Sequence, residues 1–64
     1  MTLHNLLNVV EETQKVDLRF EHIEPVCADA EALVMVLNDK ILGMIVSSIE
    51  AKDGMLKVWV KDRD

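Results

Sequence analysis

The side chains best suited to chemistry in this 64-residue chain lie close together in the segment EHIEPVC, residues 21–27. Four of them can bind a metal ion: Glu21, His22, Glu24 and Cys27. Their spacing fits no established zinc motif, and a thiolate beside two carboxylates is a mixed ligand set that suits no metal well. We therefore predict no metal site and no cofactor here, and regard the four residues as chance neighbours in an acidic loop.

A nucleophilic pair is the other chemistry to consider, because Cys27 with His22 or His4 would combine a thiol with an imidazole. Catalysis by such a pair also needs an orienting base, an oxyanion hole and a substrate cleft. A chain of this length has little room for them. It also has no glycine-rich phosphate loop, because Gly43 and Gly54 are its only glycines. The sequence thus predicts a protein that is not an enzyme.

The negative charge of the chain is concentrated in its first half. Residues 1–32 hold seven carboxylates against two cations, which accounts for the whole net charge of −5. An acidic protein repels phosphate backbones, and Phe20 and Trp59 are its only aromatic residues, so we expect no nucleic-acid partner. An acidic half would suit a basic protein, but a solvated surface that keeps a small protein soluble is the simpler explanation.

The length of the chain limits its stability. It is long enough for a single domain, residues 1–64, and such a domain buries only about 60% of the surface that its unfolded form exposes. One cysteine cannot form an internal disulfide, so we expect self-association into a homo-oligomer to supply part of the missing stability. The sequence begins without a basic signal-like stretch, and no apolar run approaches the roughly 18 residues that span a bilayer. We expect a cytoplasmic protein without a membrane partner.

Apolar periodicity predicts the elements of the first half. Residues 3–10 are apolar at the spacing of one helix face, and Thr2 precedes them at an N-cap position. Residues 16–20 alternate between apolar and charged side chains, as in a strand with one wet face. Pro25 then marks a loop or the start of an edge strand, and a short strand around residues 26–27 follows.

The segment 29–38 contains an apolar run that fits either a buried strand or a helix. Residues 30–33 are good helix formers, Asp29 is suited to the N-cap, and Asn38 followed by Asp39 supplies a stop signal. We predict a helix, although the two valines in the run favour a strand.

The dipeptide Asp53-Gly54 predicts a hairpin, because a primed turn needs positive φ angles. A two-residue loop would pair Ser48 with Trp59 and Ile49 with Val58. Alternation then assigns three aliphatic side chains of the last strand to the core: Leu56, Val58 and Val60.

By the same alternation, Trp59 falls on the outer side of the sheet. Counting back along the preceding strand places Val46 and Met44 on that side too. Tryptophan is enriched at interface hot spots, so we predict a binding surface with an apolar centre and a charged rim. Its candidate residues are Trp59, Val46, Met44, Lys57 and Lys61. In the competing interpretation, the indole is covered by its own chain.

These elements together predict an α+β domain in the order helix, strand, strand, helix, strand, strand. A small antiparallel sheet of three to four strands would pack on the N-terminal helix, with a second short helix beside it.

Two segments carry a resemblance: LLNVVEETQKVDLRF, residues 6–20, and VSSIEAKDGMLKVWV, residues 46–60. They resemble the opening helix and strand and the closing hairpin of very small uncharacterised proteins encoded by phages, prophages and mobile elements of Gram-positive gut bacteria. The segment between them does not match clearly, since such proteins usually have a polar hairpin loop where this chain has EHIEPVCADA. The resemblance implies the same order of elements and a genomic setting, and it carries no activity.

Two functions remain as expectations. The first is a non-enzymatic interaction protein, an accessory or anti-defence factor of a phage or mobile element. It would bind a host protein through the Trp59 face or through the acidic N-terminal half. The alternative is an oligomer that binds a small metabolite or signalling nucleotide between its subunits.

Overall fold

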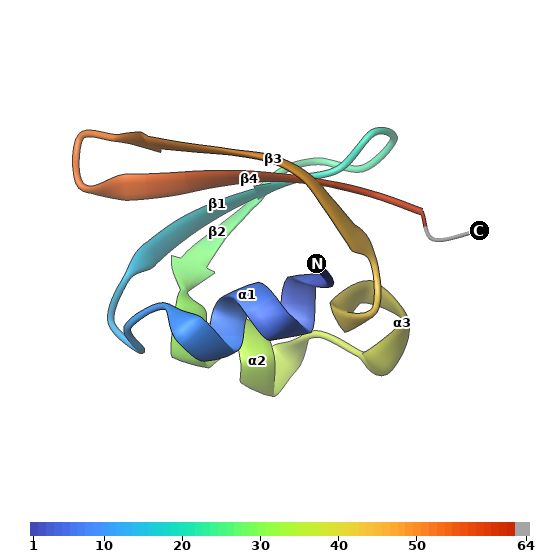
Figure 1. Cartoon of the computed structure of the whole chain (residues 1–64), viewed down its shortest axis with the longest axis horizontal. Helices are drawn as coiled ribbons and strands as arrows, with labels where there is room; N and C mark the ends of the chain where they lie inside the picture. The colour runs from blue at the N-terminus through green and yellow to red at the C-terminus, as the bar shows by residue number, and fades with distance from the viewer. Residues whose placement is uncertain (63–64) are drawn as a thin grey trace.

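The computed structural model describes residues 1–62 and consists of one sheet with helices on one of its faces (Figure 1). The elements in chain order are α1 (Leu3–Val9), β1 (Lys15–Arg19), β2 (Val26–Asp29), α2 (Ala30–Val36), α3 (Asp39–Leu42), β3 (Ile45–Lys52) and β4 (Met55–Lys61). The predicted α+β class is confirmed, as are the N-terminal helix, the four strands and a helix in the segment 29–38. The short helix α3 is additional.

The strands lie in the order β2-β1-β4-β3. The outer pairs, β1 with β2 and β3 with β4, are antiparallel, whereas the central strands β1 and β4 run parallel to each other. The sheet is therefore mixed, and the prediction of an antiparallel sheet was wrong for its central pair. The alternation of side chains within a strand carries no information about the direction of a neighbour that lies far along the chain.

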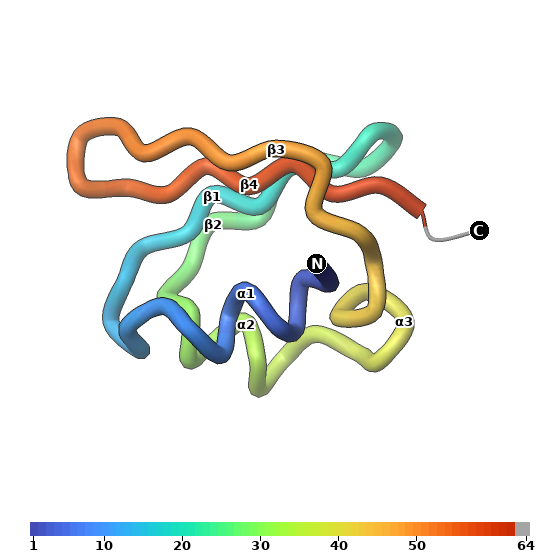
Figure 2. Tube along the Cα trace, viewed as in Figure 1, coloured from blue at the N-terminus to red at the C-terminus, as the bar shows by residue number. Residues whose placement is uncertain are grey.

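The helices pack on the sheet through one continuous core. The trace of the chain shows all three helices on the same side of the sheet (Figure 2). Helix α1 begins at Thr2, whose Oγ1 accepts a hydrogen bond from the backbone N–H of Asn5 at 3.2 Å. The fully or nearly fully buried apolar residues come from both layers: Leu3, Leu6, Leu7, Val16, Leu18, Ala30, Leu33, Leu42, Val58 and Val60.

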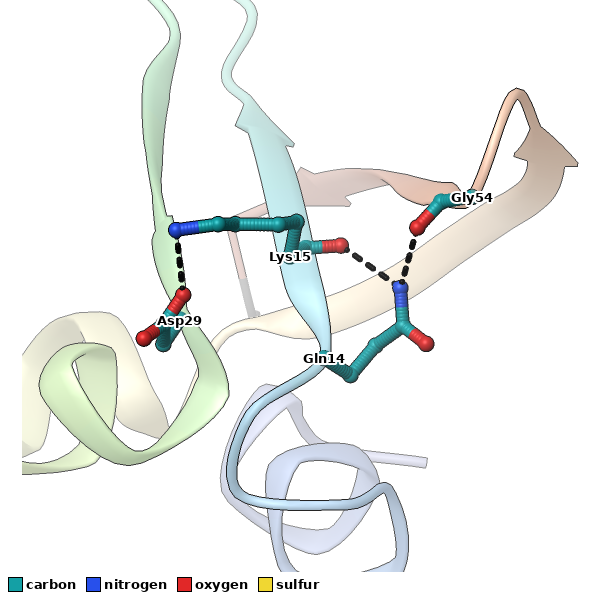
Figure 3. Close-up of polar contacts among 4 residues, drawn as sticks. All are labelled: Gln14, Lys15, Asp29 and Gly54. Carbon is teal, nitrogen blue, oxygen red and sulfur yellow. Dashed lines mark hydrogen bonds and ion pairs between the residues drawn. The ribbon is translucent and has the colours of Figure 1, made fainter.

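The boundary between β2 and α2 differs from the expected helix start. Asp29 occupies the N-cap position, but its side chain makes no capping hydrogen bond. Its carboxylate lies 2.7 Å from the ammonium group of Lys15 on β1 instead (Figure 3). Downstream, Asn38 caps α3, because its Oδ1 accepts a hydrogen bond from the N–H of Ile41 at 2.9 Å. The expected stop signal is therefore also a start signal for the next helix.

The hairpin between β3 and β4 has the predicted turn. Asp53 and Gly54 have φ angles of 54° and 75°, the positive values that a primed turn requires. The amide group of Gln14 connects this turn to β1: its Nε2 donates to the carbonyl oxygens of Gly54, at 3.0 Å, and Lys15, at 2.9 Å (Figure 3). This bridge lies where the parallel pairing of β1 and β4 begins.

Candidate functional site

The helices leave one side of the sheet free, and we call this side the outer face. The buried residues of β1 and β4 point toward the helices, so the residues between them point to the opposite side. None of the described helices lies over it (Figures 1 and 2). Strand pairing assigns to the outer face Cys27 and Asp29 of β2, Lys15, Asp17 and Arg19 of β1, Met55, Lys57, Trp59 and Lys61 of β4, and Ile45, Ser48, Glu50 and Lys52 of β3.

Trp59 lies in an inner strand of this face and is half-buried. Its cross-strand neighbours are Arg19 on β1 and Ser48 on β3, and Lys57 and Lys61 are its same-side neighbours on β4. Tryptophan buries more apolar area than any other side chain and keeps a polar N–H. The indole is thus placed as the sequence predicted, on the side of the sheet away from α1.

Two of the other predicted interface residues pack against the core and do not lie beside Trp59. The pairing of β3 with β4 contains a bulge between Val46 and Ser48, which leaves Val46 opposite Val60, a core residue. Val46 and Met44 both pack against the core. The prediction placed them beside Trp59, and this was wrong because one extra residue in a strand reverses the alternation beyond it.

Ile45 lies on the outer face near Trp59, where Val46 and Met44 had been predicted. It lies opposite Lys61 and is half-buried on the outer face. The start of β3 is also held by the first residues of the chain, because the N–H of Val46 donates to the carbonyl of Met1 at 2.9 Å. The bulge residue Ser47 donates its hydroxyl to the carbonyl of Trp59 at 3.1 Å. These bonds fix the backbone around the indole.

A carboxylate that the sequence did not single out lies at the centre of the outer face. Asp17 is only 8% exposed, and its cross-strand neighbours are Cys27 and Lys57. Its Oδ2 accepts hydrogen bonds from Nε and Nη2 of Arg19, at 3.2 and 3.1 Å. Because that pair holds the guanidinium group in place, Arg19 is pre-ordered beside Trp59. The parallel pairing that creates this arrangement could not be read from the local sequence pattern.

Few side chains of the cluster in residues 21–27 come together in the described structure. His22 Nε2 lies 3.7 Å from a carboxylate oxygen of Glu21, and both side chains are exposed. Cys27 is an exposed free thiol on β2, and no hydrogen bond joins it to His22. Among residues 1–62, no three His, Cys, Asp or Glu side chains come close enough together to hold a metal ion.

The acidic N-terminal half does not form a single surface either. Its two strand carboxylates, Asp17 and Asp29, are ion-paired with Arg19 and Lys15. The other five are exposed and lie in two groups, one before the start of β1, where the N–H of Glu31 donates to the carbonyl of Glu12 at 3.1 Å, and one after its end. One group comprises Glu11, Glu12 and Glu31, and the other comprises Glu21 and Glu24.

An apolar hollow of about 600 Å³ lies between helix α3 and the segment that follows β1. Four apolar side chains line it, with polar groups at its rim: Phe20, Ile23, Ile41 and Met44, then Asn38, Lys40 and Asp62. Ile23 is 64% exposed. Phe20 packs against the core and is only half-buried.

No protein-family model matches this chain, and neither the curated proteins nor the solved structures give a match. None of the helices within residues 1–62 is long and apolar enough to cross a membrane.

Proposed function

We propose that this protein is a non-enzymatic interaction protein that binds a host protein through the outer face of its sheet. In this proposal it acts in the cytoplasm as an accessory or anti-defence factor of a phage or mobile element, the setting that the resemblance implies. The observation that carries the proposal is the position of Trp59, a large aromatic side chain on a sheet face that none of the described helices covers.

The surroundings of the indole support this proposal. Ile45 lies on the same face opposite Lys61, next to the indole along β4, and Met55 lies farther along β4 beyond Lys57, while charged side chains surround these apolar residues. Such an apolar centre with a polar rim is the usual composition of a protein interface. The face is also built on paired strands, and the ion pair of Asp17 with Arg19 holds one of its large side chains in place. A surface that is ordered before binding loses less conformational entropy when a partner docks.

The test is a comparison of three immobilised baits in a lysate of a Gram-positive host: the wild-type protein, Trp59→Ala and Val36→Ala. Val36 is a matched control, because it is an apolar side chain 72% exposed on helix α2, in the other layer. We expect the wild type and Val36→Ala to retain one host protein that Trp59→Ala loses. That host protein, once purified, must then form an equimolar complex with the wild type in solution.

Two outcomes would contradict the proposal. Retention of the same host protein by all three baits would place the binding surface elsewhere. Loss through Val36→Ala alone would assign binding to the helix layer. Circular dichroism of each bait shows whether it is folded, so that a lost interaction is not mistaken for a lost fold.

A second candidate function, the binding of a small apolar molecule, is favoured by the hollow beside Phe20. Its volume of about 600 Å³ falls within the usual range for small-molecule sites, and its lining is apolar with a few polar groups. A native mass spectrum of freshly purified protein tests this function, because a bound ligand adds a defined mass to the protein. Ile41→Glu should abolish binding, so this added mass should be missing from its spectrum. The same spectrum reports the oligomeric state, so the expected homo-oligomer is tested together with it.

A further inference from the structure

The outer face carries a charge of opposite sign to the rest of the molecule. The whole chain has a net charge of −5, and its charged residues divide unequally between the outer face and the remainder. Five cations and three carboxylates on this face leave an excess of two positive charges, so all other residues together carry −7. The charged residues of the face are Lys15, Arg19, Lys52, Lys57, Lys61, Asp17, Asp29 and Glu50.

The ion pairs make this imbalance sharper around Trp59. Asp29 and Asp17 are neutralised by Lys15 and Arg19, at 2.7 and 3.1 Å, and both pairs lie in the β1–β2 half of the face. The β3–β4 half holds the other three lysines, and among residues 1–62 no ion pair within 4.0 Å involves them. Glu50, opposite Lys57, is the only carboxylate of that half. A docking partner therefore meets Lys61, which lies opposite Ile45, on one side of the indole, and Lys57, whose strand neighbours are Asp17 and Glu50, on the other.

We infer that an acidic segment of the partner protein binds to the outer face. An apolar side chain of that segment would contact Trp59, and its carboxylates would contact Lys57 and Lys61. This inference rests on the proposed function and names the chemistry of its partner. Charge complementarity steers the encounter and fixes the orientation of the partner, while the aromatic contact supplies most of the affinity. The −7 on the remainder of the molecule repels an acidic partner from every other approach.

Charge also decides against the other occupants of this face. Two copies that met through their outer faces would bring net positive surfaces together, which disfavours a symmetric dimer at this site. A nucleic acid would meet one indole and no second aromatic platform, since Phe20 packs against the core.

The chain supplies its own probe for the experiment. Trp59 is the only tryptophan and there is no tyrosine, so intrinsic fluorescence reports on this face alone. Three ligands are titrated at low ionic strength: a short peptide of alternating glutamate and leucine, the same peptide with lysine in place of glutamate, and a short oligothymidylate. We expect the glutamate peptide to shift the emission in a saturable manner, and the lysine peptide and the oligonucleotide to bind at least tenfold more weakly. Added salt should weaken the binding of the glutamate peptide.

Two charge reversals separate local charge from net charge. Lys57→Glu and Lys40→Glu change the net charge of the protein equally, but Lys57 lies on the outer face and Lys40 on helix α3. We expect Lys57→Glu to weaken binding of the glutamate peptide about tenfold and Lys40→Glu to leave it within about twofold. Equal weakening by both variants would overturn the inference, because the effect would then come from net charge.

The remaining outcomes distinguish this inference from the proposed function. Preference for the lysine peptide or for the oligonucleotide would overturn the acidic partner, and the oligonucleotide result would assign the face to single-stranded nucleic acid. If neither peptide changes the emission while the host protein still depends on Trp59, the inference fails and the proposed function stands. If the host protein is also independent of Trp59, both fail. Sedimentation that shows a dimer dissociated by Lys57→Glu would assign the face to a second copy and overturn the inference.

Discussion

Replacing Leu18 and Ile49 by alanine, each in turn, tests the arrangement of the core. Both substitutions remove three carbon atoms from a side chain on the helix side of the sheet, but the two sites differ in cover. Leu18 on β1 is fully buried, whereas Ile49 on the edge strand β3 is 45% exposed. The hairpin that carries Ile49 extends beyond the helix layer (Figure 1).

The expected costs follow from this difference. Leu18→Ala loses its transfer free energy and leaves a cavity, which together cost about 3 to 5 kcal/mol. A chain of 64 residues has a total unfolding free energy of about 3 to 10 kcal/mol. Ile49→Ala removes groups that are only about half out of water and leaves no closed cavity, so about 1 kcal/mol is expected.

Thermal unfolding followed by circular dichroism measures both effects. A change of 1 kcal/mol shifts the Tm of so small a domain by about 4 to 8 °C, so Ile49→Ala should lower it by that amount. Leu18→Ala should lower it by more than about 12 °C or abolish the transition. Equal losses would refute this assignment, because they would show that Ile49 is fully covered in solution, for example by a second copy of the chain.

Substitutions at three further positions test the hairpin turn, its link to β1 and the ion pair between β1 and β2. Gly54→Ala should lower the unfolding free energy, measured in urea, by about 1 kcal/mol, because alanine is strained at a φ of 75° although nothing lies within 4 Å of the added Cβ. Gly54→Asn should lower the unfolding free energy less, and an unchanged unfolding free energy in both variants would exclude the primed turn. Gln14→Ala should lower the unfolding free energy by about 1 kcal/mol, because two hydrogen bonds are lost. Gln14→Glu should lower it by a similar amount, because glutamate has the same size but no N–H donor. Full stability of Gln14→Glu would show that these bonds contribute nothing. For Lys15, the hydrogen bond to Asp29 and then the charge of that carboxylate raise the pKa above its ordinary value, so the ion pair stabilises the fold at neutral pH and this contribution is lost only as the pH rises through the raised pKa. The difference in Tm between the wild type and Lys15→Met should therefore stay constant from about pH 6 to about pH 9. A difference that shrinks within that range would contradict this.

The parts of the fold that were predictable from the sequence depend on local patterns. Helix α1 follows from apolar spacing behind the Thr2 cap, β1 from strict alternation, and the hairpin from the positive φ angles that Asp53-Gly54 accepts. Each of these signals lies within a few residues of the element that it specifies. The placement of Trp59 on the outer face was predictable for the same reason, because it needs only the alternation within β4.

The parts that were not predictable depend on contacts between distant segments or on one extra residue. The parallel pairing of β1 with β4, which brings Arg19 beside Trp59, has no local signature. The bulge at Ser47 reverses the alternation of β3. Val46 and Met44 are therefore not part of the outer face, where they had been predicted, and Ile45 is. Asp29 was expected to cap a helix, but the neighbouring strand presents Lys15 to its carboxylate instead. The charge asymmetry of the outer face likewise appears only once the strands are paired.

The affinity of the purified host protein for the wild type and for Trp59→Ala, measured by isothermal titration calorimetry, tests the central claim most directly. A tryptophan at the centre of an interface commonly contributes about 2 kcal/mol or more, so the Kd should rise by roughly thirtyfold or more in Trp59→Ala. Ser48→Ala, at the cross-strand neighbour of the indole, should change the Kd by less than about threefold. A Kd that is the same for the wild type and a folded Trp59→Ala would mean that the outer face is not the binding surface.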